Sequence, residues 1–134
     1  MRAACVAPFV LALAGAASAA WPCGVCVEDK VAATYDWAVM QQAVAKGQAV
    51  VFCELAGRVD AQRITQAARQ VRGLERASLR ISQDPAALSF AMDAAQQSPQ
   101  AAVAAMQRAL PAGLRVKVLK VVAGNGFEAA SAQR

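Results

Sequence analysis

Two cysteines near the N-terminus are the residues of this chain best suited to chemistry. Cys23 and Cys26 are separated by Gly24 and Val25, which gives the Cys-x-x-Cys spacing. Two thiols at this spacing can form a disulfide, exchange one with another protein, or hold a soft metal ion. The sequence contains no histidine, so imidazole catalysis and histidine-based metal sites are excluded. Three chemistries therefore compete for one pair of residues.

The residues before this pair have the features of an export signal. Arg2 supplies a positive start, residues 3–16 form an apolar run, and residues 17–19 are small, as is typical of a cleavage site. The run is shorter than the about 20 apolar residues that a membrane-spanning helix needs. We therefore expect a signal peptide over residues 1–20, a periplasmic or secreted mature chain that begins at or next to Trp21, and no transmembrane anchor after cleavage.

Cleavage would leave three of the four cysteines, because Cys5 belongs to the signal segment. In an oxidising compartment an odd count leaves one thiol unpaired, shared between chains or used chemically. The third cysteine, Cys53, can be a further metal ligand, a disulfide partner of Cys23 or Cys26, or a small buried core residue. A disulfide to Cys53 would close a loop of about 28 residues and contribute about 3 kcal/mol.

Each chemistry of the pair makes a different demand. Two thiolates, Cys23 and Cys26, can hold a cuprous ion but are incomplete for zinc, which prefers four ligands in structural sites. Cys53 can assist a site for copper or zinc as a third ligand if its strand lies near the N-terminal segment. The sequence from Trp21 to Cys26 also superficially resembles the Trp-Cys-x-x-Cys of thioredoxin-type oxidoreductases. That fold places a strand directly before its motif, whereas here the expected cleavage site intervenes.

The residues that follow the pair predict one helix. Residues 27–46 carry apolar side chains at helical spacing, and Gly47 is the expected stop signal. Because these side chains lie on both sides of the helix, we expect the rest of the domain to cover it, with Tyr35 and Trp37 in the core.

Further along, the hydrophobic period alternates between that of strands and that of helices. The predicted strands are 49–55, 78–82, 88–92 and 114–118, and the predicted helices are 60–72 and 98–110. The order strand, helix, strand, strand, helix, strand is that of a ferredoxin-like sandwich. The sequence therefore predicts an α+β fold, a ferredoxin-like βαββαβ sandwich with an additional N-terminal helix.

One stretch of this region resembles a known family. Residues 71–80, Val-Arg-Gly-Leu-Glu-Arg-Ala-Ser-Leu-Arg, are similar to the end of the first helix and start of the second strand in heavy-metal-associated domains. The likeness covers about residues 50–122. It implies a ferredoxin-like fold and, by analogy, a role with soft metals. Metal-carrying members hold their Cys-x-x-Cys after the first strand, where this chain has Ala56-Gly57-Arg58, so no ligand can be carried over.

The mature chain is long enough for one compact domain and is modestly basic. We divide the chain into a signal peptide (1–20), a Cys-x-x-Cys segment with the N-terminal helix (21–47), a heavy-metal-associated-like domain (48–122) and a flexible tail (123–134). Of the arginines between residues 58 and 80, Arg63, Arg69 and Arg72 lie on different sides of the predicted helix. Because they are dispersed and the compartment offers little nucleic acid, we expect no nucleic-acid partner. Arg80, Arg115 and Lys117 can instead converge on the open face of the sheet as a binding surface, provided that the N-terminal helix leaves this face uncovered.

Catalysis finds little support elsewhere in the chain. The acidic residues are scattered, and neither a phosphate-binding loop nor a nucleophile elbow is present. We therefore favour a non-enzymatic role. The prediction is a small exported binding module that takes up a soft metal, copper or zinc, through Cys23 and Cys26. The alternatives are a disulfide-stapled domain that binds a protein partner in the periplasm without metal, and a thiol-disulfide oxidoreductase.

Overall fold

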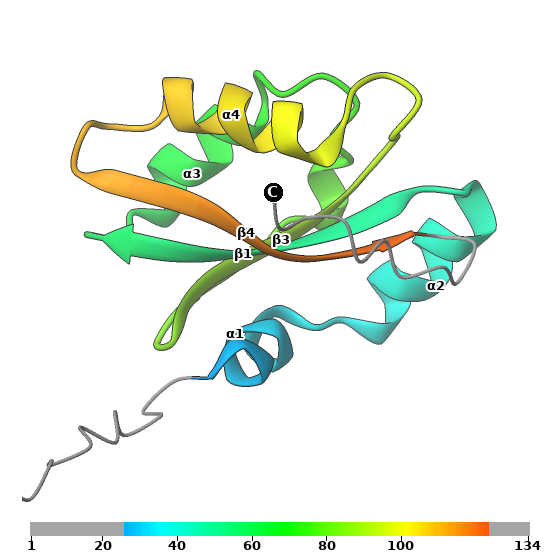
Figure 1. Cartoon of the computed structure of the whole chain (residues 1–134), viewed down its shortest axis with the longest axis horizontal. Helices are drawn as coiled ribbons and strands as arrows, with labels where there is room; N and C mark the ends of the chain where they lie inside the picture. Colours follow the sequence, from blue (N-terminus) through cyan, green and yellow to red (C-terminus); the bar gives the residue numbers. More distant parts are fainter. Residues whose placement is uncertain (1–25, 124–134) are drawn as a thin grey trace, which may run out of the picture.

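Four β-strands form one antiparallel sheet at the centre of the domain (Figure 1). The computed structural model describes residues 26–123. The strands are β1 (Ala49–Gly57), β2 (Arg80–Gln83), β3 (Ala86–Met92) and β4 (Leu114–Ala123), and they lie in the order β2-β3-β1-β4. The described helices are α1 (Val27–Thr34), α2 (Trp37–Lys46), α3 (Ala61–Ala68) and α4 (Pro99–Ala109), with a short 3₁₀ turn at Arg76–Ser78.

The structure confirms the predicted α+β class and the alternation of strands and helices after residue 48. The ends of the elements differ: β4 runs on to Ala123, and α3 ends at Ala68 rather than at residue 72. Ser98 caps α4 by accepting a hydrogen bond from the Ala101 N–H at 3.1 Å, with Pro99 at the first helical position as the sequence predicts. The expected signal peptide, Cys23 and the tail after Ala123 lie outside the described residues.

Helices cover both faces of the sheet (Figure 1), and the central strand β1 therefore buries side chains on both sides. Successive strand residues point to opposite faces. Val51, Cys53 and Leu55 belong to the main core beneath α3 and α4. Val50 and Phe52 belong to a second, smaller core beneath α1 and α2.

The main core is built from a few large side chains. Phe90, Ile64 and Met106 are fully buried and come from β3, α3 and α4. Burial of each such side chain contributes about 1.5–3 kcal/mol. Residues 61–68 have a well-separated apolar stripe, because Ile64, Ala67 and Ala68 are buried while their neighbours are exposed.

The prediction of a single helix over residues 27–46 is wrong, because the structure divides this segment into α1 and α2. The chain is extended at Asp36, whose carboxylate accepts hydrogen bonds from the N–H groups of Ala38 at 2.9 Å and Val39 at 3.3 Å. Aspartate is a strong N-cap and competes with the helical backbone for hydrogen bonds. A second helix therefore starts where the apolar period alone predicted continuity.

The predicted burial of Tyr35 and Trp37 is also wrong. Tyr35 is 48% exposed and Trp37 is 63% exposed. The two helices bury Val39 and Ala43 against the sheet, leave Val31 and Met40 half-buried, and form the outermost layer of the described structure on this side. Their remaining apolar side chains therefore point outward.

Polar contacts attach this outer layer to the sheet. Arg80 on β2 places its Nε and Nη2 atoms each 2.9 Å from the Asp36 carboxylate, and Lys30 of α1 lies 2.7 Å from Glu54 of β1. The hydroxyl of Ser89 on β3 donates to the backbone carbonyl of Thr34 at 3.0 Å, inside the protein.

In residues 26–123 no helix is long and apolar enough to cross a membrane.

The Asp36 contact makes a pH-dependent prediction. The hydrogen bond from Arg80, aided by that from Val39, lowers the pKa of Asp36, so folding favours the charged carboxylate. Its stabilisation is therefore fully present above about pH 4, the unfolded value, and is lost as the pH falls through the lowered folded pKa. We expect Asp36→Asn, which keeps a capping side chain, to lower the urea midpoint at neutral pH and to lose this deficit in acid.

The matched control for this variant is Asp60→Asn. Asp60 caps α3 through the N–H groups of Gln62 and Arg63 and takes part in none of the ion pairs of the described residues. We expect Asp60→Asn to lower the urea midpoint at neutral pH by less than Asp36→Asn does. An Asp36→Asn deficit that is the same at about pH 7 and about pH 2 would contradict the assignment.

A second prediction concerns the end of β1. Gly57 has a φ of 108°, and a Cβ atom there would lie 2.0 Å from the carbonyl oxygen of Gly113. Gly57→Ala should therefore lower the free energy of unfolding by more than about 2 kcal/mol, through backbone strain and collision together. Gly47→Ala, where φ is 66° and the space around the Cβ is open, should cost only about 1 kcal/mol. Urea titrations followed by circular dichroism measure both values, and equal losses would be the contrary result.

Candidate functional site

Of the three cysteines predicted to act together, the structure describes Cys26 and Cys53, and these two lie on opposite sides of the sheet. Cys26 is the N-cap of α1 and is half-buried, and its N–H donates to the Asp29 carboxylate at 3.3 Å. Helix N-termini favour negative charge, which suits a thiolate, but Glu28 and Asp29 already supply two carboxylates in this first turn. Cys23 lies outside the described residues.

Cys53 is a residue of the main core. It is only 1% exposed and packs with Val51 and Leu55 on the side of β1 that faces α3 and α4. Burial raises the pKa of its thiol far above the ordinary value, because the charged form would lose its hydration. The sheet lies between Cys53 and α1, so the structure does not bring Cys53 to Cys26 as a metal ligand or a disulfide partner.

The three basic residues predicted to form one surface occupy the two edges of the sheet. Arg80 lies on edge strand β2, where its guanidinium is engaged by Asp36. Arg115 and Lys117 lie on the other edge strand, β4, and both are exposed. Two strands and the covering helix α1 separate the groups, so the structure does not bring Arg80 together with the other two.

An apolar surface that sequence reasoning missed lies on the outer side of α1 and α2. We call it the helical face and define it by six side chains: Val27, Val31, Tyr35, Trp37, Met40 and Val44. Large hydrophobic side chains that stay exposed on a folded domain commonly mark an interaction site when they are contiguous. The sequence did contain one signal for this surface, namely the strong N-cap at Asp36 between two aromatic residues.

The helical face contains two adjoining hollows. The first, of about 390 Å³, lies along α1 and is lined mainly by Val27, Val31 and Tyr35, with Glu28 and Lys120 at its rim. The second, of about 460 Å³, lies along α2 and is lined by Tyr35, Trp37, Met40, Gln41, Val44 and Ala45. Tyr35 borders both hollows and joins them into one surface.

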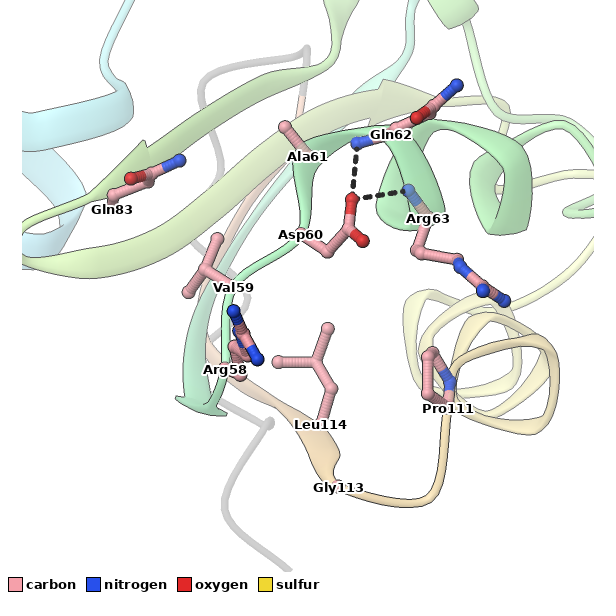
Figure 2. Close-up of a pocket in the computed structure, with 10 residues that line it drawn as sticks. All are labelled: Arg58, Val59, Asp60, Ala61, Gln62, Arg63, Gln83, Pro111, Gly113 and Leu114. Atoms are coloured by element: carbon pink, nitrogen blue, oxygen red, sulfur yellow. Dashed lines mark hydrogen bonds between the residues drawn. The ribbon is translucent and has the colours of Figure 1, made fainter.

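A further pocket, of about 630 Å³, lies where β1 leads into α3 (Figure 2). Figure 2 shows the Asp60 carboxylate accepting hydrogen bonds from the backbone of Gln62 and Arg63 at 3.1 and 3.2 Å. Arg58, Arg63 and Leu114 line the same pocket, and the two arginines are exposed. The carboxylate is occupied as a helix cap, and the pocket contains no thiol, so its residues can attract an anion but supply no nucleophile.

The described residues thus present two apolar hollows and one arginine-lined pocket. In residues 26–123 no cluster of three or more cysteine, aspartate or glutamate side chains could hold a metal ion. No protein-family model, curated protein or solved structure matches this chain.

The position of Cys53 predicts its reactivity. Because its thiol is buried and its pKa is raised, iodoacetamide should alkylate it only after the domain unfolds, even in mildly alkaline solution. Mass spectrometry of peptides labelled with and without urea measures this directly. Cys53→Ala should leave the labelling of the N-terminal cysteines unchanged, and rapid labelling of Cys53 in the native protein would contradict the packing.

Proposed function

We propose that this protein is a small exported binding module that recognises a protein partner through the helical face. The observation that carries the proposal is the 63% exposure of Trp37 at a hollow lined almost wholly by apolar side chains. Aromatic residues dominate the binding energy of protein interfaces when a partner covers them. Tyr35 lies beside Trp37 and gives the surface a second aromatic anchor.

The arrangement of strands supports a ferredoxin-like assignment for the core. Helix α3 connects β1 to β2, and α4 connects β3 to β4, which matches the split β-α-β order of that fold. The resemblance to heavy-metal-associated domains rests on the same region. At the loop where metal-carrying members of that family hold their cysteines, this chain has the arginine-lined pocket of Figure 2. We therefore assign binding to the added helices α1 and α2.

Soft-metal binding through Cys23 and Cys26 is a second candidate function. The observation in its favour is the position of Cys26, which directly precedes α1 and thus adjoins Val27 at the first hollow. A bound ion would then lie at one end of the helical face. Because Cys53 faces the other core, two thiolates remain, and such a pair suits a cuprous ion better than zinc. Thiol-disulfide exchange by the same pair is the third candidate.

Photo-crosslinking from the helical face tests the proposed function. A benzoylphenylalanine at position 37 replaces one exposed aromatic residue with another, and one at exposed Ala104 on α4 is the matched control on the opposite layer. We expect irradiation of cells that export the protein to give a discrete adduct from position 37 and none from position 104. Identical adducts from both positions, or no adduct from position 37, would count against the proposal.

Metal titration tests the second candidate. Purified, reduced protein should bind one cuprous ion, Cys23→Ser should abolish this binding, and Cys53→Ala should leave it unchanged because that thiol lies in the core. A competition titration with a chromogenic chelator measures the stoichiometry. Full uptake by Cys23→Ser, or none by the unmodified protein, would remove the candidate.

A further inference from the structure

Strand β4 adjoins the first hollow of the helical face through Lys120 and carries three cationic side chains on the side of the sheet that α1 and α2 cover. We call Arg115, Lys117 and Lys120 the basic strip. Arg115 and Lys117 pair in the sheet with Ala56 and Glu54, which belong to the side of β1 that α1 covers. Lys120 also lines the first hollow of the helical face.

A β-bulge places the third cation on this side. Strict alternation along β4 would put residue 120 on the face opposite to residues 115 and 117. The pairing between β1 and β4 shifts between Phe52 and Cys53, so Lys120 stands opposite Phe52, whose side chain belongs to the core beneath α1 and α2. The extra residue thus turns an interrupted row of charges into a continuous one.

Two cations of the strip, Arg115 and Lys117, are not paired with the carboxylates beside them in the described residues. Glu54, which stands opposite Lys117, is engaged by Lys30 at 2.7 Å. Arg115 and Lys117 take part in none of the ion pairs found in residues 26–123. Among the described residues Glu28 is the one carboxylate that lines the first hollow, so Arg115 and Lys117 leave this side of the sheet with a positive excess.

We propose that the occupant of the helical face is an acidic amphipathic segment of a partner protein. Its apolar side chains would fill the two hollows that meet at Tyr35, and its carboxylates would lie along the basic strip. Amphipathic segments bind apolar grooves through spaced anchors, and complementary charges at the rim fix their orientation and speed association. This inference rests on the proposed function and names the chemistry of the partner.

The shape of the surface favours a protein segment over an anionic membrane. A bilayer surface can cover exposed aromatic side chains, but it cannot fill hollows of about 390 and 460 Å³ with discrete side chains. Two lysines of the same helices, Lys30 and Lys46, pair with Glu54 and Glu75, so these helices add little net positive charge for lipid phosphates.

A pair of synthetic peptides tests the inference. The first is an amphipathic helix of about 18 residues with leucine and phenylalanine on one face and glutamate on the other, and the second carries lysine in place of every glutamate. In a Trp21→Phe background, which leaves Trp37 as the one tryptophan, we expect the acidic peptide to shift Trp37 fluorescence to the blue. Calorimetry should give the acidic peptide at least about tenfold tighter binding than the basic one, with an advantage that shrinks as salt increases.

Charge reversal identifies the strip as the source of this preference. The double variant Arg115→Glu with Lys117→Glu should weaken acidic-peptide binding by about tenfold or more and strengthen binding of the basic peptide. Trp37→Ala should weaken both by about tenfold or more, because it removes the shared anchor. Arg63→Glu with Arg69→Glu, an equal double charge reversal at exposed residues in and directly after α3 on the opposite layer, should change neither.

Several outcomes would overturn the inference. These are equal affinity for both peptides, no binding of either, preferential binding to phosphatidylglycerol vesicles, and concentration-dependent self-association that buries Trp37. An adduct from position 37 with a partner surface that lacks acidic residues would overturn this inference and leave the proposed function standing. The absence of both the adduct and peptide binding would overturn the two together.

Discussion

The burial of β1 on both of its faces is the constraint on which the rest of the structure depends. A strand that carries apolar side chains in both directions must be covered from both sides, because each exposed face would leave large hydrophobic groups in water. Val51 and Leu55 are covered by α3 and α4, and Val50 and Phe52 by α1 and α2. The N-terminal helices are therefore a second layer of the fold rather than an appendage (Figure 1).

This two-sided burial also separates the cysteines. Cys53 follows Phe52 by one residue and so points to the opposite core, where its thiol behaves as a small hydrophobic group. Cys26 starts the helix that covers the other face. A single strand position thus separates the Cys53 thiol from Cys26.

Two local features create the recognition surface. Asp36 lies between the two helices and caps the second, which buries Val39 and Ala43 while Trp37 and Val44 stay exposed. The bulge in β4 then brings Lys120 to the same side of the sheet. Neither the Asp36 cap nor the bulge contributes a side chain to the main core. Both features instead shape the surface that α1 and α2 present.

The sequence by itself determined the alternation of strands and helices from residue 48 onward, because hydrophobic period and the signals at Gly47 and Ser98 act over a few residues. It also contained the cap that divides residues 27–46, although the apolar period masked it. The tertiary structure alone decided which face each side chain meets. The exposure of Trp37, the separation of Cys53 from Cys26 and the alignment of the basic strip depend on strand register and on which helix covers which face. These are long-range properties that no local pattern specifies.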